Sequence, residues 1–167
     1  MSMIKLFKTL KTAFVIVHPL RGNAIDIHPN ARWEQQGVIV AGGNGQGHDT
    51  DLLHTPMGLF VDDEQTIYVA DYSNHRIMEW KRGATNGQVV AGGNGQGRTV
   101  VASGNRRGDH LDQLNLPLYV FVDQAQSVYV SDTENYRVMK WMKGATQGIV
   151  VAGSQGQGSS LTQFSYP

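Results

Sequence analysis

The chain has 167 residues, no cysteine, and 14 acidic against 14 basic side chains. Without cysteine it forms no disulfide, no cysteine-ligated zinc site and no thiol nucleophile. Its balanced charge also excludes an overall field that would steer it toward nucleic acid or an anionic membrane. The length corresponds to about one domain.

Residues 1–32 precede the repeated part of the chain and are predicted to form a leader, either disordered or a marginal helix. Three lysines stand before a short apolar run at residues 13–17, an order that resembles a secretory signal. The run is shorter than the roughly 7–15 apolar residues of a signal core, and too short to span a bilayer. The absence of an Asn-x-Ser/Thr sequon favours a cytoplasmic location.

A tandem duplication dominates the rest of the chain, because residues 56–97 and 117–158 align without a gap at an offset of 61. Short apolar or β-branched runs separated by polar turns predict four strands in each copy. In the first copy the predicted strands are residues 59–62, 66–70, 75–80 and 88–91. The connections are too short for crossover helices, which predicts antiparallel pairing of successive strands. Residues 37–47 copy residues 87–97, which predicts the outer strand of a preceding unit.

Both copies contain the pattern P-x-x-x-F-V-D-x-x-x-x-[IV]-Y-V-[AS]-D-x-x-N-x-R-[IV]-x-x-W, over residues 56–80 and 117–141. This pattern resembles the NHL repeat. The resemblance implies an all-β fold of four-stranded antiparallel blades, usually six to a β-propeller. It also implies a recognition platform that binds protein or, in some members, RNA.

Two departures from the family pattern concern glycine. The glycine that usually follows the proline is Gly58 in the first copy but Tyr119 in the second. The turn between the first two strands carries Glu64-Gln65 and Ala125-Gln126 where a glycine is usual. Both departures affect the expected turn geometry more than the expected fold.

The repeated region, residues 33–167, contains about two and a half blades, whereas a closed propeller needs roughly four to eight. The chain is therefore expected to be a fragment of a larger propeller whose other blades come from a longer chain. Homo-oligomerisation, as a trimer of two-blade protomers, is the less favoured alternative. Because the terminal blades would expose apolar faces and strand edges, the isolated chain is expected to aggregate or oligomerise.

An Asp-x-x-Asn-x-Arg motif recurs once in each copy. Its residues are Asp71, Asn74 and Arg76 in the first copy, and Asp132, Asn135 and Arg137 in the second. One interpretation is a charged cluster on a ligand-binding face. The other is structural: Asp and Asn accept backbone N–H groups in an Asx-type turn, and Arg pairs with a neighbouring carboxylate. Recurrence in every unit favours the structural interpretation, since an enzyme needs one site.

Two glycine runs, at residues 42–47 and 92–97, are interpreted as turns between blades. No helix is predicted to follow them, as a nucleotide-binding loop would require. The loop GHDTDLLH holds His48 and His54 with two aspartates, which are metal-ligand types, and a few NHL-type propellers are zinc-dependent lyases. The spacing matches no standard zinc pattern. A solvated loop with no metal and no cofactor is therefore predicted.

A loop at residues 98–115 contains a local basic cluster of Arg98, Arg106 and Arg107. These arginines, with His48 and His54, are the predicted binding residues, and a protein partner is favoured over RNA. No nucleophile–base pair or carboxylate dyad stands out. The predicted function is a non-catalytic NHL-repeat scaffold. The alternative is a propeller enzyme, such as a metal-dependent lyase or a hydrolase.

Overall fold

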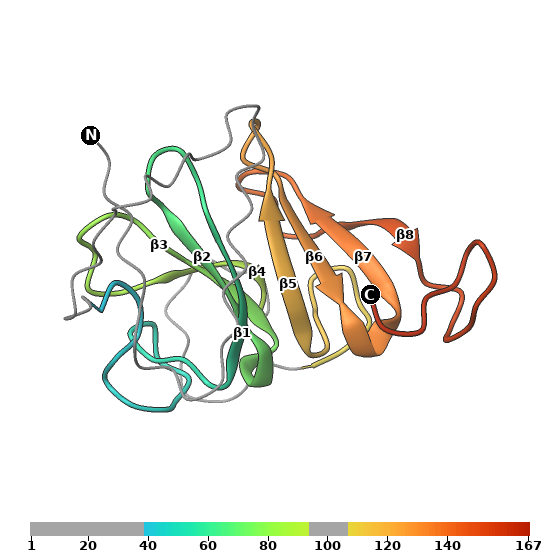
Figure 1. Cartoon of the computed structure of the whole chain (residues 1–167), viewed down its shortest axis with the longest axis horizontal. Helices are drawn as coiled ribbons and strands as arrows, with labels where there is room; N and C mark the ends of the chain where they lie inside the picture. The colour runs from blue at the N-terminus through green and yellow to red at the C-terminus, as the bar shows by residue number, and fades with distance from the viewer. Residues whose placement is uncertain (1–38, 94–106) are drawn as a thin grey trace, which may run out of the picture.

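The computed structural model of this chain describes residues 39–93 and 107–167. The predicted leader, Arg98 and Arg106 lie outside the described residues. The described part is all-β, with two four-stranded antiparallel sheets in which each strand pairs with the next one along the chain (Figure 1). No helix in this part is long and apolar enough to cross a membrane.

The two sheets have the same construction. The first consists of β1 (Pro56–Val61), β2 (Ile67–Asp71), β3 (Arg76–Trp80) and β4 (Gln88–Gly92). The second consists of β5 (Pro117–Val122), β6 (Val128–Asp132), β7 (Arg137–Trp141) and β8 (Ile149–Gly153). A 3-10 turn joins the middle strands of each sheet, η1 (Tyr72–Asn74) and η2 (Thr133–Asn135). The predicted strand order and antiparallel pairing are confirmed.

Strand register is identical in the two sheets. Ile67 pairs with Trp80 in the first sheet, and Val128 pairs with Trp141 in the second. Both sheets have irregular register near the start of the first strand and between the third and fourth strands. Residues 61 positions apart in the sequence therefore occupy equivalent positions in the two sheets.

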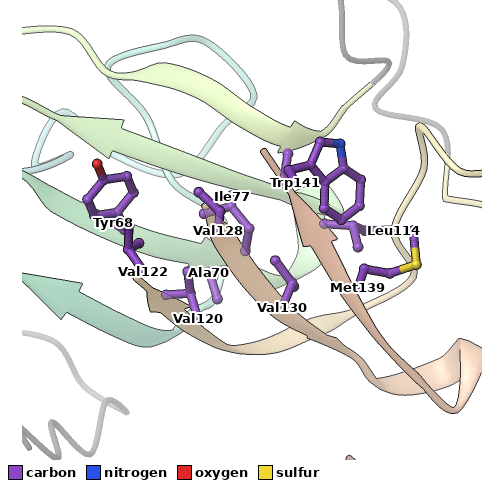
Figure 2. Close-up of a cluster of buried hydrophobic side chains, with 11 residues drawn as sticks. Tyr68, Ala70, Ile77, Leu114, Val120, Val122, Val128, Val130, Met139 and Trp141 are labelled. Atoms are coloured by element: carbon purple, nitrogen blue, oxygen red, sulfur yellow. The ribbon is translucent and has the colours of Figure 1, made fainter. Parts of the chain in front are cut away.

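The main core lies between the two sheets, as Figure 2 shows. Alternation along β2 and β3 directs one set of side chains toward the second sheet. The first sheet and its connecting loop contribute Tyr68, Ala70, Ile77, Ala91 and Leu114, and the second contributes Val120, Val122, Val128, Val130, Met139 and Trp141. Phe60 and Phe121 meet nearly edge-on with ring centroids 5.3 Å apart, a favourable aromatic geometry.

Strand β1 passes so close to β5 that only glycine fits at position 58. A Cβ built on Gly58 would lie 2.5 Å from the backbone carbonyl oxygen of Leu118. Its counterpart Tyr119 is 60% exposed. The difference between the two copies at this position therefore reflects packing: one copy has a neighbouring sheet here, and the other has no described neighbour.

The predicted outer strand at residues 37–47 is not formed where it is described. Residues 39–47 contain no strand, and a single parallel bridge joins Gln46 to Leu53. Gly42 and Gly43 have positive φ angles, but so do the equivalent Gly92 and Gly93 at the end of β4, so the missing strand reflects the lack of a described strand to pair with. Residues 37 and 38, and the end of the first predicted unit at 94–97, lie outside the described ranges.

The turn that lacks the usual glycine keeps a glycine-like backbone. Gln65 and Gln126 have φ angles of 65° and 59°, in the left-handed region that a residue with a Cβ rarely adopts. The turn geometry typical of glycine is thus retained with glutamine, at some cost in local strain.

Candidate functional site

Three loops with one backbone structure lie next to the sheets, at residues 47–56, 108–117 and 158–167. In each, the N–H of the first glycine donates to the carbonyl six residues later, and a second bond closes a tight turn inside the loop. The bonds are Gly47 to Leu53 and Leu52 to Asp49, Gly108 to Leu114 and Gln113 to His110, and Gly158 to Phe164 and Gln163 to Ser160. The sequence contains a signal for these loops: a glycine, an apolar residue six positions on, and a proline nine positions on.

This signal changes the interpretation of the loop predicted at residues 98–115. Its part from Gly108 onward is equivalent to residues 47–56 at the same offset of 61. Residues 108–115 of this stretch therefore repeat the first loop, although the two loops share few side chains. The conserved element is the backbone turn, which many residue types can form.

Arg76 anchors the first of these loops from inside the protein. Its side chain is fully buried and its Nε donates to Asp71 Oδ2 at 2.7 Å. Nη1 donates to the His48 carbonyl at 2.7 Å, and Nη2 donates to the carbonyls of Asp49 and Leu52 at 3.0 and 3.1 Å. One guanidinium therefore binds a carboxylate and three backbone carbonyls of a loop far away in sequence.

Asp71 and Asn74 complete this anchor. Asp71 Oδ1 accepts the His54 N–H at 2.7 Å, and its Oδ2 accepts Asn74 Nδ2 at 2.8 Å. Asn74 Nδ2 also donates to the Gly47 carbonyl at 2.8 Å. The predicted pairing of arginine with a carboxylate is confirmed. The predicted Asx-type turn is wrong, because the aspartate accepts an N–H from a distant loop and the asparagine acts as a donor.

The second copy repeats the anchor. Arg137 Nε donates to Asp132 Oδ2 at 2.7 Å, and Asn135 Nδ2 donates to Asp132 Oδ2 at 2.8 Å and to the Gly108 carbonyl at 2.7 Å. The arginine also donates to the carbonyls of Asp109, His110 and Gln113, at 2.7 to 3.2 Å. Burial raises the pKa of the Asp132 carboxyl, and its hydrogen bonds, among them one from the Asn115 N–H, act in the opposite direction. Burying this ion pair therefore carries a desolvation cost, which fits a role in positioning the loop.

The predicted histidine pair does come together. The His48 and His54 rings lie edge to face with centroids 6.2 Å apart. Nearby, Asp51 accepts a hydrogen bond from Asn44 at 2.9 Å. Within residues 39–93 and 107–167, no group of three His, Cys, Asp or Glu side chains is arranged to hold a metal ion.

A histidine that sequence reasoning missed links the two units. His75, which has a φ of 54° at the end of η1, accepts the Leu116 N–H on its Nδ1 at 3.1 Å. Burial lowers the pKa of His75, the positive charge of Arg107 lowers it further, and Asp71 acts in the opposite direction. The neutral ring is therefore the form that joins the first sheet to the second anchored loop. The predicted binding residue Arg107 is exposed beside this contact.

A second polar cluster recurs beside the turns between the first two strands of each sheet. The Tyr68 hydroxyl lies 3.4 Å from Asp62, and the Tyr129 hydroxyl lies 3.2 Å from Asp123. Lys140 lies 4.9 Å from the Tyr129 ring centroid. The hydrogen bond of Ser127 N–H to Asp123 lowers the pKa of that carboxyl. These contacts hold the turns, and the recurrence in both sheets is typical of structural residues.

No model of a known protein family matches this chain, and no curated protein matches it either. What the described residues establish is two equivalent antiparallel sheets in tandem, each with a buried arginine that fixes the backbone of a preceding loop.

Proposed function

We propose that the two sheets are NHL-type blades of a β-propeller, and that the protein is a non-catalytic scaffold that binds a protein partner. The observation that carries the proposal is the use made of the Asp-x-x-Asn-x-Arg motif. In both copies the side chains of this motif bind one another and the backbone of a loop. Loops whose backbones are held in this way can present their exposed side chains, such as Leu111, as a recognition surface.

The proposed binding surface consists of the two anchored loops, residues 47–56 and 108–117, with the flanking Arg107 and Tyr119. The side chains here differ between the copies although the backbones match. Leu111 and Tyr119 are 43% and 60% exposed, and aromatic anchors are typical of interaction hot spots. Arg107 adds a positive charge at the edge, where it would act on the association rate more than on affinity.

The test compares four serine variants of the full chain. A partner is identified by crosslinking in the source cells, and its Kd for each purified variant is measured by calorimetry. Leu111→Ser and Tyr119→Ser are expected to raise the Kd about tenfold or more, as loss of a hot-spot side chain does. The controls are Leu161→Ser, at the position of Leu111 in the third loop, and Val61→Ser at the end of β1; both side chains are exposed outside the two anchored loops, and both variants should leave the Kd unchanged. Equal Kd values in all four variants would place the binding surface elsewhere.

Two further outcomes separate the scaffold from its alternatives. If RNA is the partner, binding of a labelled single-stranded RNA should weaken steeply with salt and fall with Arg107→Glu. If the protein is a metal-dependent lyase or hydrolase, purified protein should contain zinc or calcium in a stoichiometric amount, and removing it should abolish activity. Either result would contradict a scaffold that binds a protein partner without a metal.

A further inference from the structure

The sequence contains three Asn-Gly dipeptides, at residues 44–45, 86–87 and 94–95. In such a dipeptide the glycine nitrogen can attack the side-chain carbonyl carbon of the asparagine, because the glycine has no side chain to hinder the approach. The reaction needs a glycine N–H that is free of other hydrogen bonds, and an asparagine side chain that can swing toward it. The third dipeptide lies outside the described residues, and the first two differ in both respects.

The Asn86-Gly87 dipeptide is held in place in the folded protein. The Gly87 N–H donates to the Thr50 carbonyl at 2.7 Å, which fixes the nitrogen that would have to attack. A Cβ built on Gly87 would lie 2.7 Å from the Trp80 ring, so the glycine backbone packs directly against this buried side chain. Attack on Asn86 therefore requires the turn after β3 to open, and the equilibrium constant of that local opening slows the reaction.

The Asn44-Gly45 dipeptide is open. Both residues are exposed, and the Gly45 N–H forms no hydrogen bond within the described part of the chain. Apart from its chain neighbours, no atom lies within 4 Å of the point where a Cβ on Gly45 would sit. One contact restrains the asparagine, because its Nδ2 donates to Asp51 Oδ2 at 2.9 Å on the surface. The net contribution of such an exposed hydrogen bond is small, so the Asn44 side chain is free for part of the time.

We propose that Asn44 is a site of spontaneous chemical modification, at which the folded protein converts asparagine to aspartate and isoaspartate. The Gly45 nitrogen gives up its proton to water and attacks Cγ of Asn44. The new N–Cγ bond closes a succinimide ring, and the Cγ–Nδ2 bond breaks as the amide group takes up a proton and leaves as ammonia. One water molecule then opens the ring. Opening at Cγ leaves a normal backbone with an aspartate side chain, and opening at the main-chain carbonyl gives isoaspartate.

The conversion reverses the contact that Asn44 makes with the first anchored loop. The Nδ2 donor is replaced by a carboxylate, so the hydrogen bond to Asp51 is lost and two like charges face each other. Asp51 belongs to the loop at residues 47–56, whose backbone is held from the inside by Arg76. The modification therefore loosens the outer edge of this loop and adds one negative charge beside it.

The test follows the full chain during incubation at mildly alkaline pH, with Asn94→Gln in the background so that two Asn-Gly dipeptides remain. Mass spectrometry of peptides measures the conversion at each asparagine. In the folded chain Asn44 should convert at least about tenfold faster than Asn86, because only Asn86 must wait for a local opening. In concentrated urea the two rates should become similar, since both asparagines precede glycine. Similar rates in the folded chain overturn the proposal, and so does a difference of the same size in urea, because the structure is then not its cause.

Two variants test the consequence for the loop. Asn44→Asp has the charge of the product and should speed amide exchange at Gly47, whose N–H donates to the Leu53 carbonyl at 3.4 Å where the loop begins. Gln155→Glu makes the same change of charge at the equivalent position of the third glycine run, residues 153–158, and should leave exchange at Gly47 unchanged. Equal exchange at Gly47 in both variants overturns the effect on the loop. None of these measurements involves a partner, so their failure is distinct from failure of the proposed binding surface.

Discussion

Replacing Arg76 by methionine should release the first anchored loop and strongly destabilise the protein. The side chain is fully buried and so is its partner Asp71. Removing one member of a buried ion pair costs about 3–5 kcal/mol, because the remaining charge is left without compensation. The expected loss is therefore about 3–5 kcal/mol, a large part of the roughly 5–15 kcal/mol that stabilises a typical domain.

Urea unfolding followed by tryptophan fluorescence measures this loss, because Trp80 and Trp141 are each 1% exposed and report on both sheets. Amide exchange adds a local measurement: Gly47, Leu52 and His54 should exchange faster in the variant, since each N–H is bonded within the anchored loop or to Asp71. The control is Arg82→Met in the exposed turn after β3, which should change stability by less than about 0.5 kcal/mol.

A double variant tests whether the arginine acts through its carboxylate. Asp71→Asn combined with Arg76→Met removes both charges, so its destabilisation should be smaller than the sum of the single variants. A loss below about 1 kcal/mol for Arg76→Met, with unchanged exchange in residues 47–56, would refute the anchoring argument. Arg137→Met provides an internal repeat, because its contacts are equivalent.

Three other predictions concern the link between the units and the backbone. In the folded state the pKa of His75 is lowered, so the unfolded state binds a proton more readily. The free energy of unfolding should therefore be highest above about pH 6.5, the pKa of an unfolded histidine, and should fall as the pH drops below it. Unfolding at about pH 7.5 and 5.5 measures this difference, and the variant His75→Tyr, based on the equivalent Tyr136, should not show it. Gln126→Gly should raise stability by about 0.5–1 kcal/mol by relieving the left-handed strain, seen as a higher Tm, and a lower Tm would show that the glutamine is not strained. Gly58→Ala should cost about 1–3 kcal/mol through overpacking against β5, whereas Tyr119→Ala should stay within about 0.5 kcal/mol; equal effects would contradict the close approach.

Much of the fold could be predicted from local pattern. Apolar and β-branched runs between polar turns, together with alternation such as that in Arg137–Trp141, identified four strands twice. The outer strand predicted at residues 37–47 failed in its described part because sequence similarity to β4 does not supply a neighbouring strand to pair with. The glutamine turns were recognised as unusual, but only the backbone shows that they keep the left-handed geometry.

The residues of the candidate site could be predicted from the sequence, but the groups that they contact could not. Asp71, Asn74 and Arg76 stood out because charged and amide side chains recur at one spacing. Their partners are mainly backbone groups of residues 47–54, and a carbonyl or an N–H leaves no trace in the identity of the residue that carries it. The sequence by itself therefore determined the strands, their order and the repeat. Only the tertiary structure decided what the arginines hold, since that depends on which loop backbone folds back within hydrogen-bonding distance.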